Sequence, residues 1–190
     1  MIWRWLAAAV IIAQAPALIP VGAFRIEPTD SRVEFVMRDN RGGFTGTTDR
    51  VEGSVTVRQC EGETFSAAVE GRIDARTLTT GNGMRDGQMR RDFLRTDQHP
   101  FITFNGTATP RDRSTGGTIR TIMRGSLTIR EVTREIDMPL EVIALADEYR
   151  ATGEVTIRLT EFGIPIPRFL IFVAEDPVLV RLRIRLKRAG

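Results

Sequence analysis

Five charged residues between positions 85 and 92 have the types and spacing that chemistry would need. Arg85, Arg90 and Arg91 carry guanidinium groups, which bind oxyanions through paired hydrogen bonds, so a phosphate or a similar polar group could bind there. Asp86 and Asp92 are carboxyl groups of the kind that acid/base enzymes use. No neighbouring motif specifies a glycosidase or a protease, and the adjacent arginines keep both aspartates ionised. Local ion pairing is therefore the simpler interpretation, and an enzyme whose polar centre is Asp86 and Asp92 is the alternative.

Other catalytic and metal-binding groups are scarce. The chain has one histidine, His99, and one cysteine, Cys60, which are too few for a zinc, haem or iron–sulfur site. His99 precedes Pro100 without any Gly-x-Ser-x-Gly motif, and Cys60 precedes an expected turn with no histidine nearby in sequence. We interpret the histidine as structural and the cysteine as passive. The sequence predicts no enzyme, no catalytic residue, no metal and no cofactor.

Length and charge limit the remaining classes of function. The 190 residues suffice for one domain, and 27 basic against 24 acidic residues leave a formal net charge of +3. The two signs are mixed along the chain, and the arginines have no aromatic–basic motif beside them. We therefore expect no nucleic-acid partner.

The first 23 residues resemble an export signal. Arg4 precedes an apolar stretch over residues 6–13, and small residues end the segment at Ala23, as a signal peptidase requires. Two prolines and a glutamine interrupt the apolar stretch too early for a membrane-spanning helix, which needs about 18 apolar residues. The sequence predicts a signal peptide over residues 1–23, a mature domain over residues 24–190, and a periplasmic or secreted location.

The elements that must position these groups are mostly strands. Apolar and polar residues alternate with a period of two, which is typical of strands with one buried face. The alternating runs cover residues 33–37, 51–57, 65–69, 101–106, 118–129, 136–142, 155–159 and 178–186. Glycine-containing clusters at residues 41–43 and 115–117 predict tight turns between strands. Apolar residues at wider spacing predict one short helix within residues 79–94. The pattern predicts an all-β fold, an antiparallel barrel or sandwich of about eight strands.

Several sequence blocks occur in the order found in a known family. The strongest is RDGQMRRDFL (85–94) followed by HPFITF (99–104), and shorter blocks are FRIE (24–27), GSLTI (125–129) and EFGI (161–164). Together they resemble the YceI-like family of secreted polyisoprenoid-binding proteins over roughly residues 24–188. The resemblance implies a lipocalin-like barrel around an isoprenoid. Asp30, Asp39, Thr48 and Leu159 depart from the family pattern and alter mainly polar groups, so the resemblance transfers the fold better than the ligand.

A barrel whose inward side chains do not meet can shield a lipid from water. Burial of a tail of about ten carbons would contribute roughly 8 kcal/mol, at about 0.8 kcal/mol per methylene, before ordering costs. The predicted ligand-binding residues are Phe35, Met37, Met84, Arg85, Met89, Arg90, Phe93, Phe104, Met123, Phe162 and Phe169. The alternative is that the apolar members fill an ordinary core and that the arginines pair with neighbouring acids.

The sequence therefore predicts binding, sequestration or transport of a polyisoprenoid or another long-chain amphiphile in the cell envelope. The alternative is a non-catalytic structural or interaction domain with a filled core. The expected partner is the lipid, while transient membrane contact and a homodimer are left open.

Overall fold

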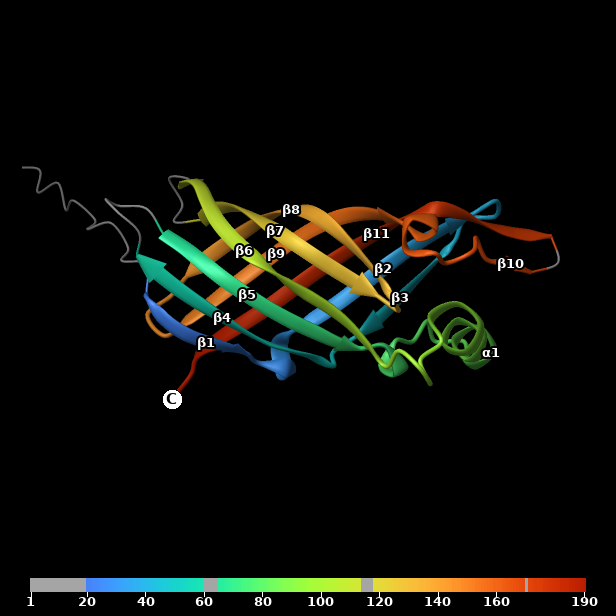
Figure 1. Cartoon of the computed structure of the whole chain (residues 1–190), viewed down its shortest axis with the longest axis horizontal. Helices are drawn as coiled ribbons and strands as arrows, with labels where there is room; N and C mark the ends of the chain where they lie inside the picture. Colours follow the sequence, from blue (N-terminus) through green and yellow to red (C-terminus); the bar gives the residue numbers. More distant parts are fainter. Residues whose placement is uncertain (1–19, 60–64, 114–117, 170) are drawn as a thin grey trace, which may run out of the picture.

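The computed structural model describes residues 20–59, 65–113, 118–169 and 171–190. These residues form eleven strands, which build a long barrel with two distinct ends (Figure 1). The strands are β1 (Gly22–Ile26), β2 (Arg32–Asp39), β3 (Phe44–Thr48), β4 (Val51–Gln59), β5 (Phe65–Asp74), β6 (Phe101–Arg113), β7 (Thr118–Ile129), β8 (Val132–Ala144), β9 (Glu148–Arg158), β10 (Arg168–Phe169) and β11 (Phe172–Arg188). Short 3-10 turns cover Pro28–Asp30, Ala75–Thr77 and Leu159–Phe162.

The sheet closes because β1 pairs on both of its edges. The order is β1-β4-β5-β6-β7-β8-β9-β11, and β11 returns to β1 with Phe24 opposite Arg188 and Ile26 opposite Leu186. On its other edge, β1 places Phe24 opposite Val55 of β4. Every pairing in this ring is antiparallel. The predicted all-β barrel of about eight strands is confirmed.

The hairpin of β2 and β3 extends the barrel wall at one end. A 3-10 turn with Pro28 at its start separates β1 from β2, and β2 then pairs with β11 from Arg183 to Ala174. The turn between β2 and β3 uses Gly42 and Gly43, whose φ angles of 134° and 109° lie where side chains are strained. The glycine turn predicted over residues 41–43 is confirmed.

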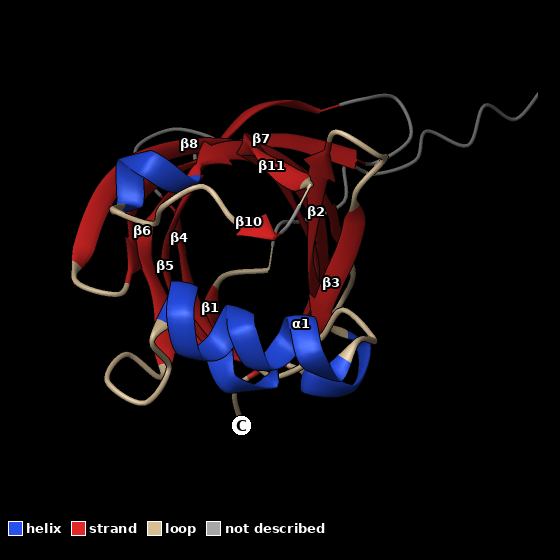
Figure 2. Cartoon of the chain, turned by 90° about the vertical axis from the view of Figure 1, so that its right-hand side faces the viewer, coloured by secondary structure: helices blue, strands red, loops and turns tan. Residues whose placement is uncertain are grey.

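The predicted short helix is also confirmed, and it covers the same end of the barrel. After β5 the chain bridges to β3, where Thr47 and Thr79 exchange backbone hydrogen bonds of 2.8 and 3.0 Å. Helix α1 (Gly83–Gln88) follows, capped by the side chain of Asn82, and continues as a π-helical turn over Met89–Leu94. Figure 2 looks at this end, where α1 borders the opening and β10 appears within its outline.

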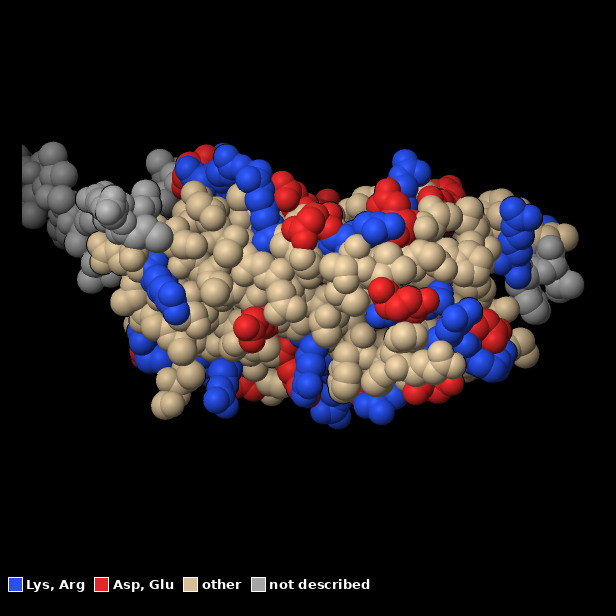
Figure 3. Space-filling view, viewed as in Figure 1, with Lys and Arg blue, Asp and Glu red and all other residues tan. Residues whose placement is uncertain are grey.

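The period of two in the sequence corresponds to an apolar inside and a charged outside. Phe24, Phe162 and Ile164 are the largest fully buried side chains among the described residues. On the outer surface, basic and acidic side chains are interspersed over the face in Figure 3. On β11, Arg181 pairs with glutamates of both neighbouring strands, as expected for an outward strand face.

The boundary of the predicted signal segment overlaps the barrel. Strand β1 begins at Gly22, and the N–H of Ala189 donates to the carbonyl of Ala23 at 2.9 Å. Residues 1–19 lie outside the described residues, as do Cys60 and the turn expected at residues 115–117. The signal peptide and its cleavage after Ala23 stay predictions. Within the described ranges, no helix combines the length and apolarity needed to cross a bilayer.

Candidate functional site

An inner cavity of about 210 Å³ lies within the barrel. It is lined mainly by inward apolar side chains of the barrel strands, among them Phe104 and Met123, two of the predicted ligand-binding residues. Ser66, Glu70, Arg72 and Thr103 also border it. Thr121 and Tyr149 also reach this wall, and both hydroxyls donate to backbone carbonyls, those of Ile119 at 3.4 Å and Pro20 at 2.5 Å. Because these polar groups are satisfied within the protein, the cavity presents a surface that suits an apolar guest better than water.

An outer cavity of about 470 Å³ lies at the end of the barrel covered by α1. It is bordered by the β2–β3 hairpin, by α1 with its π-helical extension, and by Leu159, Ile164, Pro167, Arg168 and Ala174. Six predicted ligand-binding residues line it: Phe35, Met37, Met84, Arg85, Met89 and Phe93. The fold thus brings together side chains from two segments about 50 positions apart in the sequence.

Phe35 marks the border between the two cavities. Val33 lines the inner cavity and Phe35, two residues further along the inward face of β2, lines the outer one. The Phe35 ring lies against the backbone of Gly46, where an added Cβ would come within 2.2 Å of its Cε1 atom. Phe44 meets the same ring nearly edge-on, with centroids 6.3 Å apart. Gly46 and Phe44 therefore set the position of this ring.

Arg85 is held in place by neutral groups. Its Nε donates to Thr80 Oγ1 at 2.8 Å, and its Nη2 donates to the Thr80 carbonyl at 3.3 Å. Its Cζ atom lies 4.0 Å from the centroid of the Phe44 ring, a cation–π contact. The expected pairing with Asp86 is replaced by these contacts, because the Thr80 hydroxyl stands between the two side chains.

Asp86, the next residue of α1, anchors the loop at Thr79 and Thr80 to which Arg85 is hydrogen-bonded. Its carboxylate is buried and accepts hydrogen bonds from Thr79 Oγ1 at 2.7 Å, Thr80 N at 2.8 Å and Thr80 Oγ1 at 2.5 Å. Burial acts to raise the pKa of Asp86, but the hydrogen bonds from Thr80 and Thr79 outweigh it and hold the pKa below its usual value. Asp92 lies elsewhere and pairs with Arg91 at 2.8 Å, as expected. The two carboxyl groups therefore stabilise separate local structures and do not form a pair.

Two of the predicted ligand-binding residues, Arg90 and Phe162, line neither cavity. Arg90 turns into the protein and donates from Nη2 to the Leu78 carbonyl at 2.9 Å, while its buried Nε has no partner among the described residues. Phe162 is 1 % exposed and packs into the core with Met37 and Ile164. Phe169 belongs to β10, and its side chain lies outside the described part of the structure.

The structure adds residues that sequence reasoning missed. Phe44, Arg41 and Arg168 line the outer cavity. Phe44 follows the predicted glycine turn by one residue, so extension of the alternating pattern through the hairpin could have found it. Arg168 begins the two-residue strand β10, which is too short to give a periodic signal in the sequence.

The described ranges contain no group of three or more histidine, cysteine, aspartate and glutamate side chains that could hold a metal ion. His99 Nε2 lies 3.2 Å from Glu131 Oε2, which agrees with a structural role.

The family follows from a comparison of the whole sequence with family models. The model described as a YceI-like domain matches residues 24–186, nearly the entire barrel. The chain belongs to the YceI-like domain family. None of the curated proteins searched matches this YceI-like chain.

Solved structures share the fold of this YceI-like barrel at low sequence identity. BcnA from Burkholderia cenocepacia is 18 % identical, with a TM-score of 0.66 over 84 % of this chain and 98 % of its own. A polyisoprenoid-binding domain from Saccharophagus degradans, implicated in plant cell wall breakdown, is 16 % identical, with a TM-score of 0.68 over 90 % of this chain and 100 % of its own. The YceI protein of Campylobacter jejuni is 16 % identical, with a TM-score of 0.54 over 76 % of this chain and 85 % of its own.

Proposed function

We propose that this YceI-like domain binds a polyisoprenoid or another long-chain amphiphile, with the apolar tail in the inner cavity. The observation that carries the proposal is the apolar wall of that cavity, whose hydroxyls on Thr121 and Tyr149 are already bonded to backbone carbonyls. The description of the Saccharophagus degradans domain as polyisoprenoid-binding supports the choice of ligand class.

The driving force would be transfer of the tail from water. Each buried methylene contributes about 0.8 kcal/mol, so a tail of about ten carbons offsets several kcal/mol of ordering cost. The barrel contributes to binding by maintaining an apolar cavity of fixed shape. Such binding needs no chemical reaction. We therefore include in the proposal that the protein sequesters the lipid or carries it through the envelope, and that it is periplasmic or secreted.

Delivery of a membrane lipid requires an end of the barrel that can meet a bilayer. The end bearing α1 and β10 exposes Met84 at 78 % and Ile171 at 59 % of their surfaces. Apolar side chains at the entrance to the outer cavity would allow transient contact with the membrane, which we include in the proposal.

The test is a lipid extract of the purified full chain, with native mass spectrometry of the intact protein. We expect one long-chain molecule per barrel and its loss in Ala108→Phe, which places a ring in the inner cavity. Thr107→Phe is the matched control, because Thr107 neighbours Ala108 on β6 but is exposed. If the wild-type protein contains no lipid and also does not bind an added fluorescent fatty acid, the result would favour a structural or interaction domain with a filled core.

A further inference from the structure

The charges at the outer cavity are unequal. Arg41, Arg85 and Arg168 line it together with a single acid, Asp39, so three positive charges less one negative leave a formal +2. Asp39 is itself engaged, since its Oδ1 accepts a hydrogen bond from the N–H of Arg41 at 2.8 Å. The remaining lining side chains are neutral. The cavity therefore carries an excess of positive charge above an apolar floor of Phe35, Met89 and Phe93.

Arg85 is the best-positioned of these cations. Thr80 fixes one edge of its guanidinium and Phe44 covers one face, while Asp86 in turn orients the Thr80 hydroxyl. Its Nη1 amino group has no hydrogen-bond partner among the described residues, and no described carboxylate lies within ion-pair distance. Because these contacts already restrict the Arg85 side chain, it loses less rotamer entropy when it binds a ligand.

Other arginines of the barrel differ from Arg85. Arg72, Arg91 and Arg124 on the outer surface each face a carboxylate at 2.6 to 2.9 Å. Arg85 is partly buried at a cavity wall and is matched only by hydroxyl, carbonyl and ring. A guanidinium held without a counter-ion in a cavity is suited to bind an oxyanion from outside the protein, because the charge-assisted hydrogen bonds are still available.

We propose that the outer cavity binds the anionic head of an amphiphile, a phosphate, diphosphate or carboxylate, with Arg85 as its principal contact and Arg168 as a second cation. This inference rests on the proposed function and narrows it to anionic long-chain lipids, excluding neutral alcohols and quinones as preferred ligands. The border at Phe35 gives the arrangement a direction, with the head at the α1 end and the tail toward the inner cavity.

The experiment compares two probes that share a tail, geranylgeranyl phosphate and geranylgeraniol, on the full chain at low ionic strength. We expect the phosphate to bind at least about tenfold more tightly, as one charge-assisted hydrogen bond allows. Arg85→Gln should remove most of this preference and leave geranylgeraniol binding within about twofold. Arg91→Gln is the matched control, since it removes an arginine six positions away that is paired with Asp92 outside the cavity.

Each outcome separates the head-group assignment from lipid binding itself. Equal affinity for both probes would overturn the anionic head and leave the lipid-binding barrel intact. Failure of both probes to bind would overturn the proposed function. A third arm titrates inorganic diphosphate alone; if it binds as tightly as the lipid phosphate and depends on Arg85, the site takes a free anion and the head-group assignment is wrong. Circular dichroism of each variant verifies that the barrel is folded.

Discussion

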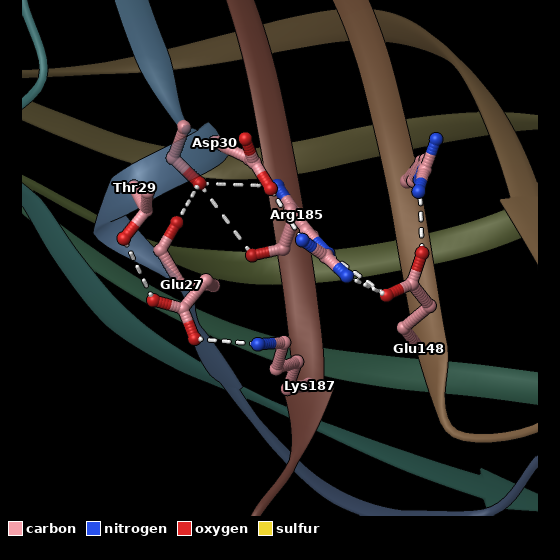
Figure 4. A network of polar contacts seen from close by, with 8 residues as sticks. Glu27, Thr29, Asp30, Glu148, Arg185 and Lys187 are labelled. Atoms are coloured by element: carbon pink, nitrogen blue, oxygen red, sulfur yellow. Dashed lines mark hydrogen bonds and ion pairs between the residues drawn. The ribbon is translucent and has the colours of Figure 1, made fainter.

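Arg185 Nη2 lies 2.6 Å from Glu148 Oε2, which joins β11 to β9 on the outside of the barrel (Figure 4). The same guanidinium also contacts Asp30 in the turn between β1 and β2. One side chain thus connects the strand that closes the barrel with the two segments on either side of it. The hydrogen bond from Arg185 is the main cause that holds the pKa of Glu148 below its usual value, and Arg150 adds to it.

This contact predicts a defined pH dependence of stability. A carboxyl whose pKa is lower in the folded state stabilises the protein above its unfolded pKa, and the contribution disappears as the pH falls through the folded value. Glu148→Gln should therefore lower the thermal midpoint at pH 7, and its difference from wild type should vanish in acid. Glu141→Gln, an exposed glutamate on β8, is the control for loss of one charge. A difference that persists unchanged at low pH would contradict the prediction.

The Phe35 ring predicts a strong effect of a single methyl group at Gly46. Because an added Cβ would lie 2.2 Å from Cε1, Gly46→Ala must displace the ring. We expect a loss of about 1–3 kcal/mol of unfolding free energy, the usual cost of overpacking, together with weaker lipid binding. Urea denaturation and fluorescent fatty-acid titration measure the two effects.

Gly87→Ala supplies the contrast for that experiment. Gly87 lies in α1, and a Cβ there meets nothing within 4 Å, so this variant should be neutral or stabilised by up to about 1 kcal/mol through helix propensity. Similar losses in both variants would show that the position of Phe35 does not matter.

The loop held by Asp86 predicts coupling between stability and head-group binding. Asp86→Asn exchanges a buried charged acceptor for an amide, so the hydrogen bonds from Thr79 and Thr80 weaken. We expect a cost of about 1–3 kcal/mol and a partial loss of affinity for geranylgeranyl phosphate, smaller than in Arg85→Gln. Asp92→Asn removes an exposed acid paired with Arg91 and should leave binding unchanged. Full phosphate affinity in Asp86→Asn would mean that Arg85 does not depend on this loop.

The exposed apolar end of the barrel predicts binding to vesicles. Met84→Ser combined with Ile171→Ser should reduce co-sedimentation with phosphatidylglycerol vesicles several-fold, because both side chains are exposed at the α1 end. Ile143→Ser is the matched control, since Ile143 is 45 % exposed near the end of β8. Equal losses in both proteins would point to general hydrophobicity instead of a docking end.

The sequence by itself determined the all-β class, the inward face of most strands and the helix within residues 79–94. These features are local: alternation fixes which side chains share a face, and Asn82 caps a helix within its own turn. Local reasoning also found Phe35, Met89 and Phe93 as candidates. It also proposed Arg90 and Phe162, which line neither cavity, because burial in the core and exposure to a cavity give the same apolar or amphipathic pattern in a sequence.

Only the tertiary structure decided that the described residues form an inner cavity and an outer cavity, and that Arg85 faces the outer one without an acidic partner. Whether an inward side chain meets its counterpart depends on the diameter of the closed barrel and on ring positions such as that of Phe35 over Gly46. The surroundings of Arg85 likewise depend on β3, which brings Phe44 to it from about 40 positions away in the chain. Long-range pairing sets both distances, and no nearest-neighbour pattern in the sequence encodes them.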